Sequence, residues 1–354
     1  MKDYDFERLA YVLRAHKKRI GAWSRLSEAI EAANPHGSAF NIGRKVLKAL
    51  CVGENAKVSL KIGQLIALDN YLIASKERPL LVKGMTLLDS IAESNSVNCF
   101  VGSRKVPARR DLVVSHWDLR ANTYISRSQL NQLRIETWDV NGEDHWNSVA
   151  TRLSTGADIA IGSPVSNFAS EILLCRMFNL PHSKKCSVTE LPFFIVGSER
   201  DKRNTSAFVR NRVDATRVDP DAAKKLSKER RSLVFAGSLF ATTRQSDFAL
   251  LLAQRNPSSG HVQAVLLGLT GRGTYKLAQI LHADRLQQTV PELGRSDRHP
   301  PVLATLYKLV LESDEEDDDF ESKGIVNYSA ELPPVLIHYV NGKWQFPEGY
   351  GRPN

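Results

Sequence analysis

The chain has 354 residues, 42% hydrophobic and 25% charged, and a net charge of +9. This length fits two domains, and the composition is that of an ordinary soluble globular protein. No apolar run approaches the roughly 20 residues that a membrane span needs, and the N-terminus lacks an apolar signal region, so we expect a cytoplasmic protein without a membrane partner.

The positive charge is concentrated at the N-terminus. Residues 1–83 contain 15 Lys and Arg against 8 Asp and Glu, so +7 of the total +9 lies there. Such a local excess is typical of a module that binds a polyanion. A solvated basic surface without a ligand is the alternative. We predict a domain boundary after residue 83, with residues 84–354 as the second domain.

Four helices are predicted in the N-terminal segment. Apolar residues recur at helical spacing over residues 6–13, and Ser24 is placed to cap a second helix. Asn41 is placed to cap a third helix, and Gly53 to end it. Apolar residues then continue at helical spacing over residues 62–73. The cations that project outward from the third helix are Arg44, Lys45 and Lys48.

A basic third helix, a glycine stop and a fourth apolar helix resemble the Cro/C1-type repressor domain. In that family the third helix lies in the major groove of duplex DNA. The resemblance implies that DNA is read or clamped by Asn41, Arg44 and Lys45, and that its phosphates are met by Lys48 and Lys57. The connection over residues 34–40 is longer than the family's usual turn. A small helical bundle that packs on the second domain or on a protein partner therefore stays open.

An α/β pattern begins near residue 97, where short apolar runs ending in Gly or Ser alternate with helical stretches. Helices are expected over residues 144–153 and 169–178. This alternation predicts a mainly parallel, doubly wound, Rossmann-like sheet, in which ligands sit beyond the carboxyl ends of the strands. The predicted strands are 97–103, 133–140, 158–163, 192–197, 232–237 and 262–268.

Two strand ends carry polar turns that open helices. Free backbone N–H groups and the positive end of the helix dipole suit a phosphate or carboxylate at such a turn. Neither turn is a Walker loop or a G-x-G-x-x-G loop. Any strand-to-helix turn uses similar residues, so a plain structural turn is the alternative. The predicted ligand-binding residues are Ser163, Ser166, Asn167, Thr270, Gly271, Arg272, Gly273 and Thr274.

Glu171 follows the first of these turns. A strand, a Ser-rich turn and a Glu on the next helix resemble the TIR and nucleoside deoxyribosyltransferase-like folds over residues 100–178. The resemblance implies a catalytic Glu171 near a ribose, because a carboxylate can stabilise an oxocarbenium-like centre or act as a nucleophile. The alternative is a side chain that only complements the dipole of its own helix.

Other motifs limit the chemistry. The segment His116–Arg120 is dense in polar and aromatic residues. In it Asp118 is placed to cap a helix, and Arg120 to face an anion. No H-E-x-x-H motif, paired cysteines or suitably placed carboxylates indicate a metal site. No cofactor is indicated, and no G-x-S-x-G elbow supports a hydrolase. Residues 312–321 hold eight acidic side chains in ten positions, which indicates an exposed loop.

These patterns favour a DNA-binding transcriptional regulator, acting as a homodimer, whose α/β domain senses a small anionic or nucleotide-like ligand. The alternative is a nucleotide N-glycosidase or NAD-consuming effector that uses Glu171. A plain interaction scaffold is the third possibility.

Overall fold

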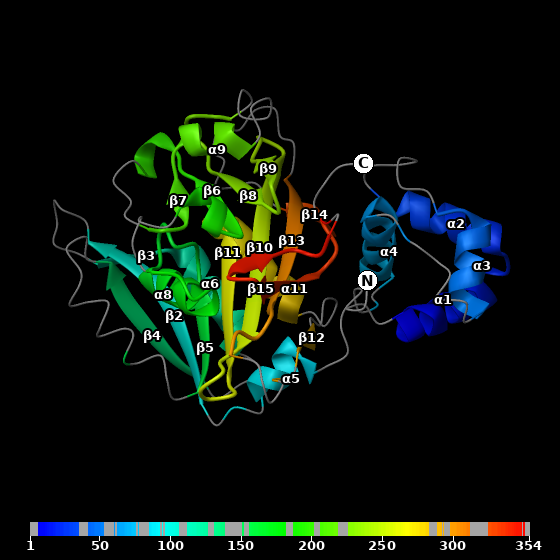
Figure 1. Cartoon of the computed structure of the whole chain (residues 1–354), viewed down its shortest axis with the longest axis horizontal. Helices are drawn as coiled ribbons and strands as arrows, with labels where there is room; N and C mark the ends of the chain where they lie inside the picture. Colours follow the sequence, from blue (N-terminus) through cyan, green and yellow to red (C-terminus); the bar gives the residue numbers. More distant parts are fainter. Residues whose placement is uncertain are drawn as a thin grey trace.

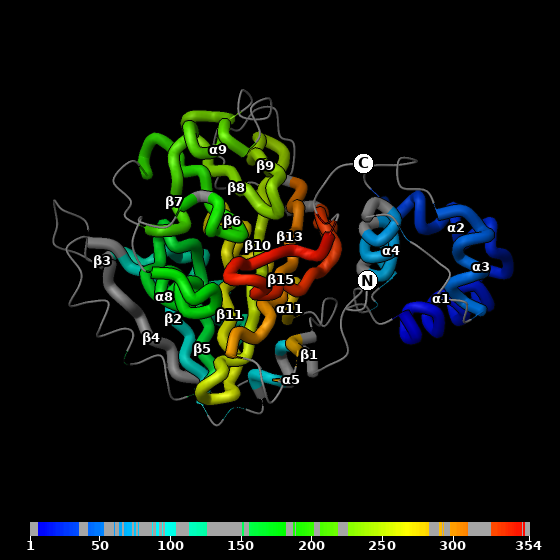
Figure 2. The backbone as a smooth tube through the Cα atoms, viewed as in Figure 1, coloured from blue at the N-terminus to red at the C-terminus, as the bar shows by residue number. Residues whose placement is uncertain are grey.

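The computed structural model shows an α/β protein that begins with a group of helices (Figure 1). Figure 2 traces the path of the chain. The residues described are 6–34, 42–52, 60, 62–75, 77, 85–92, 94, 96–105, 112–126, 131–138, 151, 156–181, 187–201, 206–218, 226–282, 289–291, 293, 298–311, 325–348 and 350. Of the predicted elements, the helix over 144–153 and the acidic stretch 312–321 lie outside this set, except for residue 151.

The N-terminal helices form where their apolar periodicity predicts them. They are α1 (Phe6–Ile20), α2 (Trp23–Ala32), α3 (Arg44–Val52) and α4 (Ile62–Ala74). Together they enclose a hydrophobic core of their own, which includes Leu9, Leu13, Leu26, Ile30, Leu47, Leu50, Leu68 and Leu72. The predicted cap at Ser24 is wrong: the N-cap of α2 is Ala22, which makes no side-chain hydrogen bond to the helix.

A ten-stranded sheet forms the centre of the remaining chain. Its strands run in the order β16-β15-β13-β10-β11-β5-β2-β3, while β14 pairs with β13 and β4 with β2. Their bounds are β2 (Val97–Lys105), β3 (Leu112–Val114), β4 (Asn131–Trp138), β5 (Ala157–Ile161), β10 (Ser246–Arg255), β11 (Val262–Gly268), β13 (Val302–Leu311), β14 (Ile325–Ala330), β15 (Val335–Val340) and β16 (Lys343–Gln345).

The sheet is mixed, so the predicted mainly parallel sheet is wrong. Only the neighbours β4, β2, β5 and β11 run parallel to one another. The strands from β10 onward are joined by antiparallel pairing. The physical reason is the connection length. A short turn between β10 and β11 allows only an antiparallel pair, whereas a parallel pair needs a long crossover.

Both faces of this sheet are covered. Helices α5 (Leu87–Ala92), α6 (His116–Ser126) and α11 (Gly271–His282) pack on one face. Helix α8 (Phe168–Met177) packs on the other. Side chains alternate between the faces, with Leu250 and Leu252 in one core and Leu251 in the other. Burial on both faces explains why strands such as β10 are apolar throughout rather than at alternate positions.

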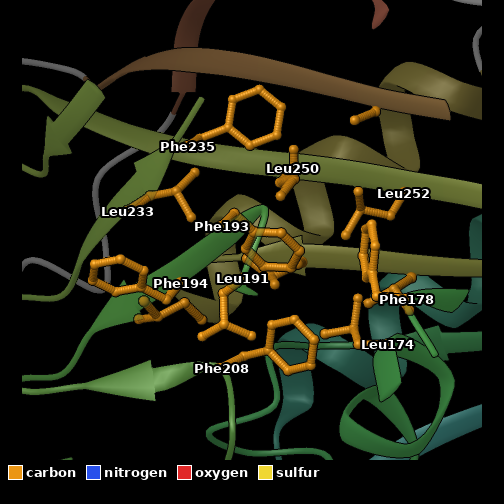
Figure 3. Packing of buried hydrophobic residues seen from close by; sticks show 14 of the residues in the cluster. Leu174, Phe178, Leu191, Phe193, Phe194, Phe208, Leu233, Phe235, Leu250 and Leu252 are labelled. Atoms are coloured by element: carbon orange, nitrogen blue, oxygen red, sulfur yellow. The ribbon is translucent and has the colours of Figure 1, made fainter. Parts of the chain in front are cut away.

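A second sheet of four strands lies on the α8 side, in the order β7-β6-β8-β9. It contains β6 (Phe193–Val196), β7 (Val209–Arg210), β8 (Ser232–Phe235) and β9 (Ser238–Ala241). The runs 192–197 and 232–237 are therefore strands as predicted, but they belong to this sheet and pair antiparallel with each other. Aromatic side chains fill the space between the two sheets; Phe193 stacks on Phe208 with ring centroids 5.2 Å apart (Figure 3).

The remaining elements are short or peripheral. Strands β1 (Met85–Thr86) and β12 (Thr289–Val290) pair with each other, and α9 (Arg212–Val218) follows β7. Two single turns of 3₁₀ helix cover Val188–Glu190 and Glu199–Asp201. The aromatic C-terminal segment packs back on the domain, as its composition predicts: Trp344 Nε1 donates to the carbonyl of Phe178 at 2.5 Å.

Candidate functional site

Helix α3 presents its cations to solvent. Arg44, Lys45 and Lys48 are all exposed, whereas Leu47 and Leu50 on the opposite side are buried in the helical core. This division follows from the spacing of the apolar residues along the helix. The predicted readers therefore lie on one open face. Asn41 and Lys57, the other two predicted DNA contacts, lie outside the described residues.

Both ends of α3 are held by side chains from other helices. Ser27 Oγ on α2 donates to the carbonyl of Ile42 at 2.6 Å, just before the helix begins. Arg14 Nη1 on α1 donates to the carbonyl of Cys51 at 3.2 Å, near its end. The bond to Cys51 satisfies a carbonyl group that the end of a helix leaves without a partner, and the bond to Ile42 ties the residue before the helix to α2. The basic face is consequently fixed to the rest of the bundle.

Three helices begin at the carboxyl ends of the parallel strands. Helix α8 follows β5, and α11 follows β11. Strand β3 pairs with β2 beyond the end of β5, with Val114 opposite Ser103, so that α6 also begins at this edge. The N-termini of α6 and α11 meet there: a Cβ added to Gly271 would lie 3.1 Å from Trp117 Cβ. The topology thus brings both predicted turns to the same end of the sheet. The carboxyl ends of β2, β5 and β11, with the turns and helix N-termini beside them, are called the carboxyl edge below.

The first turn is held by Asn167. Its Nδ2 donates to the carbonyls of Phe100 at 2.8 Å and Ile161 at 3.0 Å, and its Oδ1 accepts from Ala169 N at 3.0 Å. The side chain is fully buried and caps α8. These contacts give Asn167 a structural role in place of the predicted ligand contact, because its hydrogen-bonding groups already serve the backbone.

Two serines of the same turn differ in access. Ser163 is buried, whereas Ser166 is exposed and donates to the carbonyl of Ser163 at 3.3 Å. A further serine, Ser170, donates from Oγ to the carbonyl of Gly162 at 2.7 Å. Gly162 has φ +112°, a conformation that favours glycine. Ser166 remains the member of this turn whose hydroxyl a ligand can reach.

The second turn is occupied in a similar way. Thr270 Oγ1 accepts from Gly273 N at 3.1 Å and donates to Asp247 at 2.5 Å. Thr274 is buried, accepts from Gly268 N at 3.0 Å and donates to the carbonyl of Thr270. Both hydroxyls therefore stabilise the entry into α11. Of the predicted residues here, Gly271 lies at the surface of the turn, against Trp117.

Arg272, which was predicted to bind the ligand, is buried. It is 5% exposed, and its charge acts on the carboxyl of the buried Asp247. Burial raises the pKa of Asp247 to about 6, while the hydrogen bond from Thr270 and the charge of Arg272 act in the opposite direction. A buried guanidinium whose charge acts on a buried carboxyl is poorly exposed to a ligand. The predicted ligand contact through Arg272 is not what this geometry favours.

Glu171 lies inside the protein, away from solvent. It is 2% exposed; Oε1 accepts from Ala207 N at 2.7 Å, and Oε2 accepts from Ser206 Oγ. Burial raises its pKa to about 7, and these hydrogen bonds act in the opposite direction. The carboxyl thus joins α8 to the segment before β7. This position does not suit a group that must touch a ribose. The contacts with Ser206 and Ala207 favour a structural carboxyl, which differs from the alternative of a side chain that only complements the dipole of its own helix.

The sequence pattern did not identify Asp118 as part of the edge; it indicated a helix cap. The cap of α6 is instead Ser115, whose Oγ accepts from Asp118 N at 3.4 Å. Asp118 is 2% exposed, and burial raises its pKa to about 7, against the lowering effects of Ser115 and Arg231. Its carboxyl lies beside the first turn: a Cβ added to Gly162 would be 3.2 Å from Asp118 Oδ2.

Arg231 is the second residue that the sequence pattern did not identify. Its Nε and Nη2 each donate to the Asp201 carboxyl at 2.9 Å, and Nη1 donates to the carbonyl of Leu269 at 3.4 Å. Arg231 precedes β8 of the small sheet, whereas Leu269 follows β11 of the large one. The guanidinium therefore brings a positive charge from one sheet to the carboxyl edge of the other.

Aromatic side chains cover the adjoining surface of α6 and α11. Trp117 and Tyr275 lie 5.4 Å apart between ring centroids, and the Arg120 guanidinium sits 5.7 Å from each ring. His116 packs on Trp117 with centroids 4.5 Å apart. The polar and aromatic composition of the segment His116–Arg120 signals part of this cluster in the sequence, whereas Tyr275 comes from α11 and joins it through the fold.

Comparisons of the chain with protein-family models, with curated proteins and with solved structures found no match. Among the described residues, no group of three or more His, Cys, Asp or Glu side chains is arranged to hold a metal ion. None of the helices in the described part of the chain is both long enough and apolar enough to cross a membrane. The features that bear on function are therefore the basic face of α3 and the carboxyl edge of the large sheet.

Proposed function

We propose that the protein is a DNA-binding transcriptional regulator whose α/β part senses a small anionic or nucleotide-like ligand. The observation that carries the proposal is the open face of α3, on which Arg44, Lys45 and Lys48 are exposed together. Cations on one face of a helix neutralise DNA phosphates, and Arg pairs well with guanine. The protein binds its operator as a dimer in the cytoplasm, because one short helix makes too few base contacts for useful specificity.

The carboxyl edge supports the sensing role. The parallel core of β4, β2, β5 and β11, with helices on both faces, favours a Rossmann-like arrangement, in which ligands bind at this edge. Ser166, Gly271 and Arg231 meet there with the N-termini of α6 and α11. A ligand that binds one arrangement of the protein more tightly shifts the population toward it, and DNA affinity changes accordingly.

The test is DNA binding by the full chain, followed by fluorescence anisotropy at several salt concentrations. The logarithm of the affinity should fall with the logarithm of salt, by about 0.9 for each phosphate contact. Replacing Arg44, Lys45 and Lys48 together with Ala should reduce both the affinity and this slope. A control variant replaces the exposed Arg217, Arg298 and Lys343, which removes the same charge elsewhere.

Binding that is absent at low salt, or that does not depend on salt, would refute the DNA-binding role. Equal losses in the two triple variants would assign the binding to overall charge rather than to α3.

A further inference from the structure

One buried carboxyl oxygen at the edge accepts no hydrogen bond from the described residues. Asp118 Oδ1 is enclosed and has no partner among them, although the side chain is 2% exposed. Leaving such an oxygen unpaired is costly, and buried polar groups usually find a donor. Its neighbour Oδ2 lies at the Gly162 turn, where a ligand is expected. A ligand whose donor reaches this turn would satisfy the oxygen.

The four-stranded sheet contributes cations to the carboxyl edge of the large sheet. Arg231 uses three of its five N–H groups on Asp201 and Leu269 among the described residues, which leaves two. The positive charge of Arg231 acts on Asp118. Thr242 Oγ1 donates to the carbonyl of Arg231 at 2.5 Å, and the exposed Arg244 lies two residues further along the chain. Guanidinium groups gathered in this way suit phosphate, which they bind through paired hydrogen bonds.

Aromatic rings and a guanidinium group lie next to Asp118 on helix α6. His116 and Arg120 are exposed, and both pack on Trp117, the residue before Asp118. Nucleobases stack on aromatic rings and on guanidinium planes. Trp117 also contacts the Gly271 turn, and Arg231 contacts Leu269 in that turn. The turn after β11 therefore lies between the aromatic side chains and the guanidinium of Arg231.

These features together select one class of ligand. A simple anion suits the cations but brings no donor for the Asp118 oxygen, whereas a neutral base leaves the cations without a partner. A ligand that carries phosphate, a hydrogen-bond donor and an aromatic base offers a partner to the cations, to the Asp118 oxygen and to the aromatic side chains.

We propose that this edge binds a nucleotide. Its phosphates meet Arg231 and Arg244, a ribose hydroxyl or base N–H donates to Asp118 Oδ1, and its base stacks against His116, Trp117 and Arg120. This inference rests on the proposed ligand-sensing function and names the ligand class for it.

The experiment is calorimetric titration of the full chain with ATP, GTP, CTP and UTP, and with tripolyphosphate as a ligand without base or ribose. At least one nucleotide should bind about tenfold or more tightly than tripolyphosphate, because a hydrogen bond to a charged group contributes that much. Asp118→Asn should remove most of that preference, since the shape is kept while the charge is lost and one of the two acceptor oxygens is replaced by a donor. Asp214→Asn, which alters a partly exposed carboxyl on α9, should have no effect.

Arg244→Ala provides a second variant whose folding is not in question, because the side chain is exposed. It should weaken the nucleotide and tripolyphosphate alike. Equal affinity for tripolyphosphate and for every nucleotide would overturn the nucleotide inference and leave the anion sensor standing. No binding of any of these ligands would overturn both, while the DNA titration would still report on α3 independently. A nucleotide preference that survives Asp118→Asn would also overturn the inference.

Discussion

Arg231 and Asp201 form a two-point ion pair in which both hydrogen bonds measure 2.9 Å. The pair is largely enclosed, with side-chain exposures of 26% for Arg231 and 6% for Asp201. Asp201 Oδ2 also accepts from the backbone N and the Oγ of Ser198. The carboxyl therefore fixes the guanidinium direction, and a fixed guanidinium loses less entropy when it binds an anion.

Asp201→Asn should lower the free energy of unfolding by about 1–3 kcal/mol at pH 7, because a charged hydrogen-bond acceptor is lost. Burial raises the pKa of Asp201, but Arg231 and Ser198 more than offset this, so the pKa lies below its ordinary value of 3.8. The contribution is then present above about pH 4 and lost as the pH falls below that value. Urea unfolding at pH 7 and pH 3 measures this. A difference between the proteins that stays constant with pH would contradict the role of the pair.

Glu171→Gln should change the pH dependence of stability in the direction opposite to that of Asp201→Asn. Burial raises the pKa of Glu171 from 4.5 to about 7. Its stabilising contribution is therefore full below pH 4.5 and is lost as the pH rises through 7, because ionisation inside the protein is unfavourable. Relative to the wild type, the variant should gain stability between pH 5 and pH 8 in urea titrations.

The comparison between the two proteins matters in that experiment. Asp118 and Asp247 also have raised pKa values, so both proteins should lose stability as the pH rises. Only the difference between them reports on Glu171. Parallel pH profiles would mean that Glu171 is ionised at pH 5.

Gly102→Ala should destabilise the protein by about 1–3 kcal/mol through overpacking. A Cβ at this position would lie 2.0 Å from the carbonyl oxygen of Ser166, which is backbone and cannot turn aside. Gly43→Ala is the matched control, because no atom lies within 4 Å of the added carbon. Thermal unfolding of both variants measures the effect. Similar melting temperatures would show that the turn after β5 can move away from β2.

Arg44→Ala and Lys48→Ala should affect DNA binding differently. If Arg44 pairs with a guanine, its loss should cost about 1–3 kcal/mol and reduce discrimination between operator and random duplexes. Lys48 meets phosphates under the same proposal, so its loss should weaken all duplexes alike. Competition binding against random DNA measures both. Equal effects of the two changes on specific and random DNA would show that α3 does not read sequence.

Local patterns in the sequence predicted the elements well. The helices α1 to α4 and the strand-to-helix segments at β5–α8 and β11–α11 follow from apolar periodicity and from turn residues, which act over a few positions. Strand partners were less predictable. The apolar runs of β6 and β8 look like those of β5, yet they form a separate sheet, because pairing depends on contacts between distant segments.

The site was predicted only in part for the same reason. Polar residues in the turns suggested ligand contacts, but Asn167 and Thr274 bond to the backbone of their own turns. Residues that face the edge from elsewhere, Asp118 and Arg231, are 113 positions apart and meet only through the fold. The DNA-binding, dimer and ligand predictions remain to be tested.

Helix α4 has a consequence for any attempt to separate the two parts of the chain. Residues 67–72 of this helix are buried without interruption, which covers every side of an α-helix. One side faces the helical core, and the helix also contacts β14 of the large sheet. Cutting the chain after residue 83 would expose surface that β14 now covers. The isolated fragment should therefore tend to self-associate, and a fragment carrying polar replacements on that side of α4 would be needed to keep it monomeric.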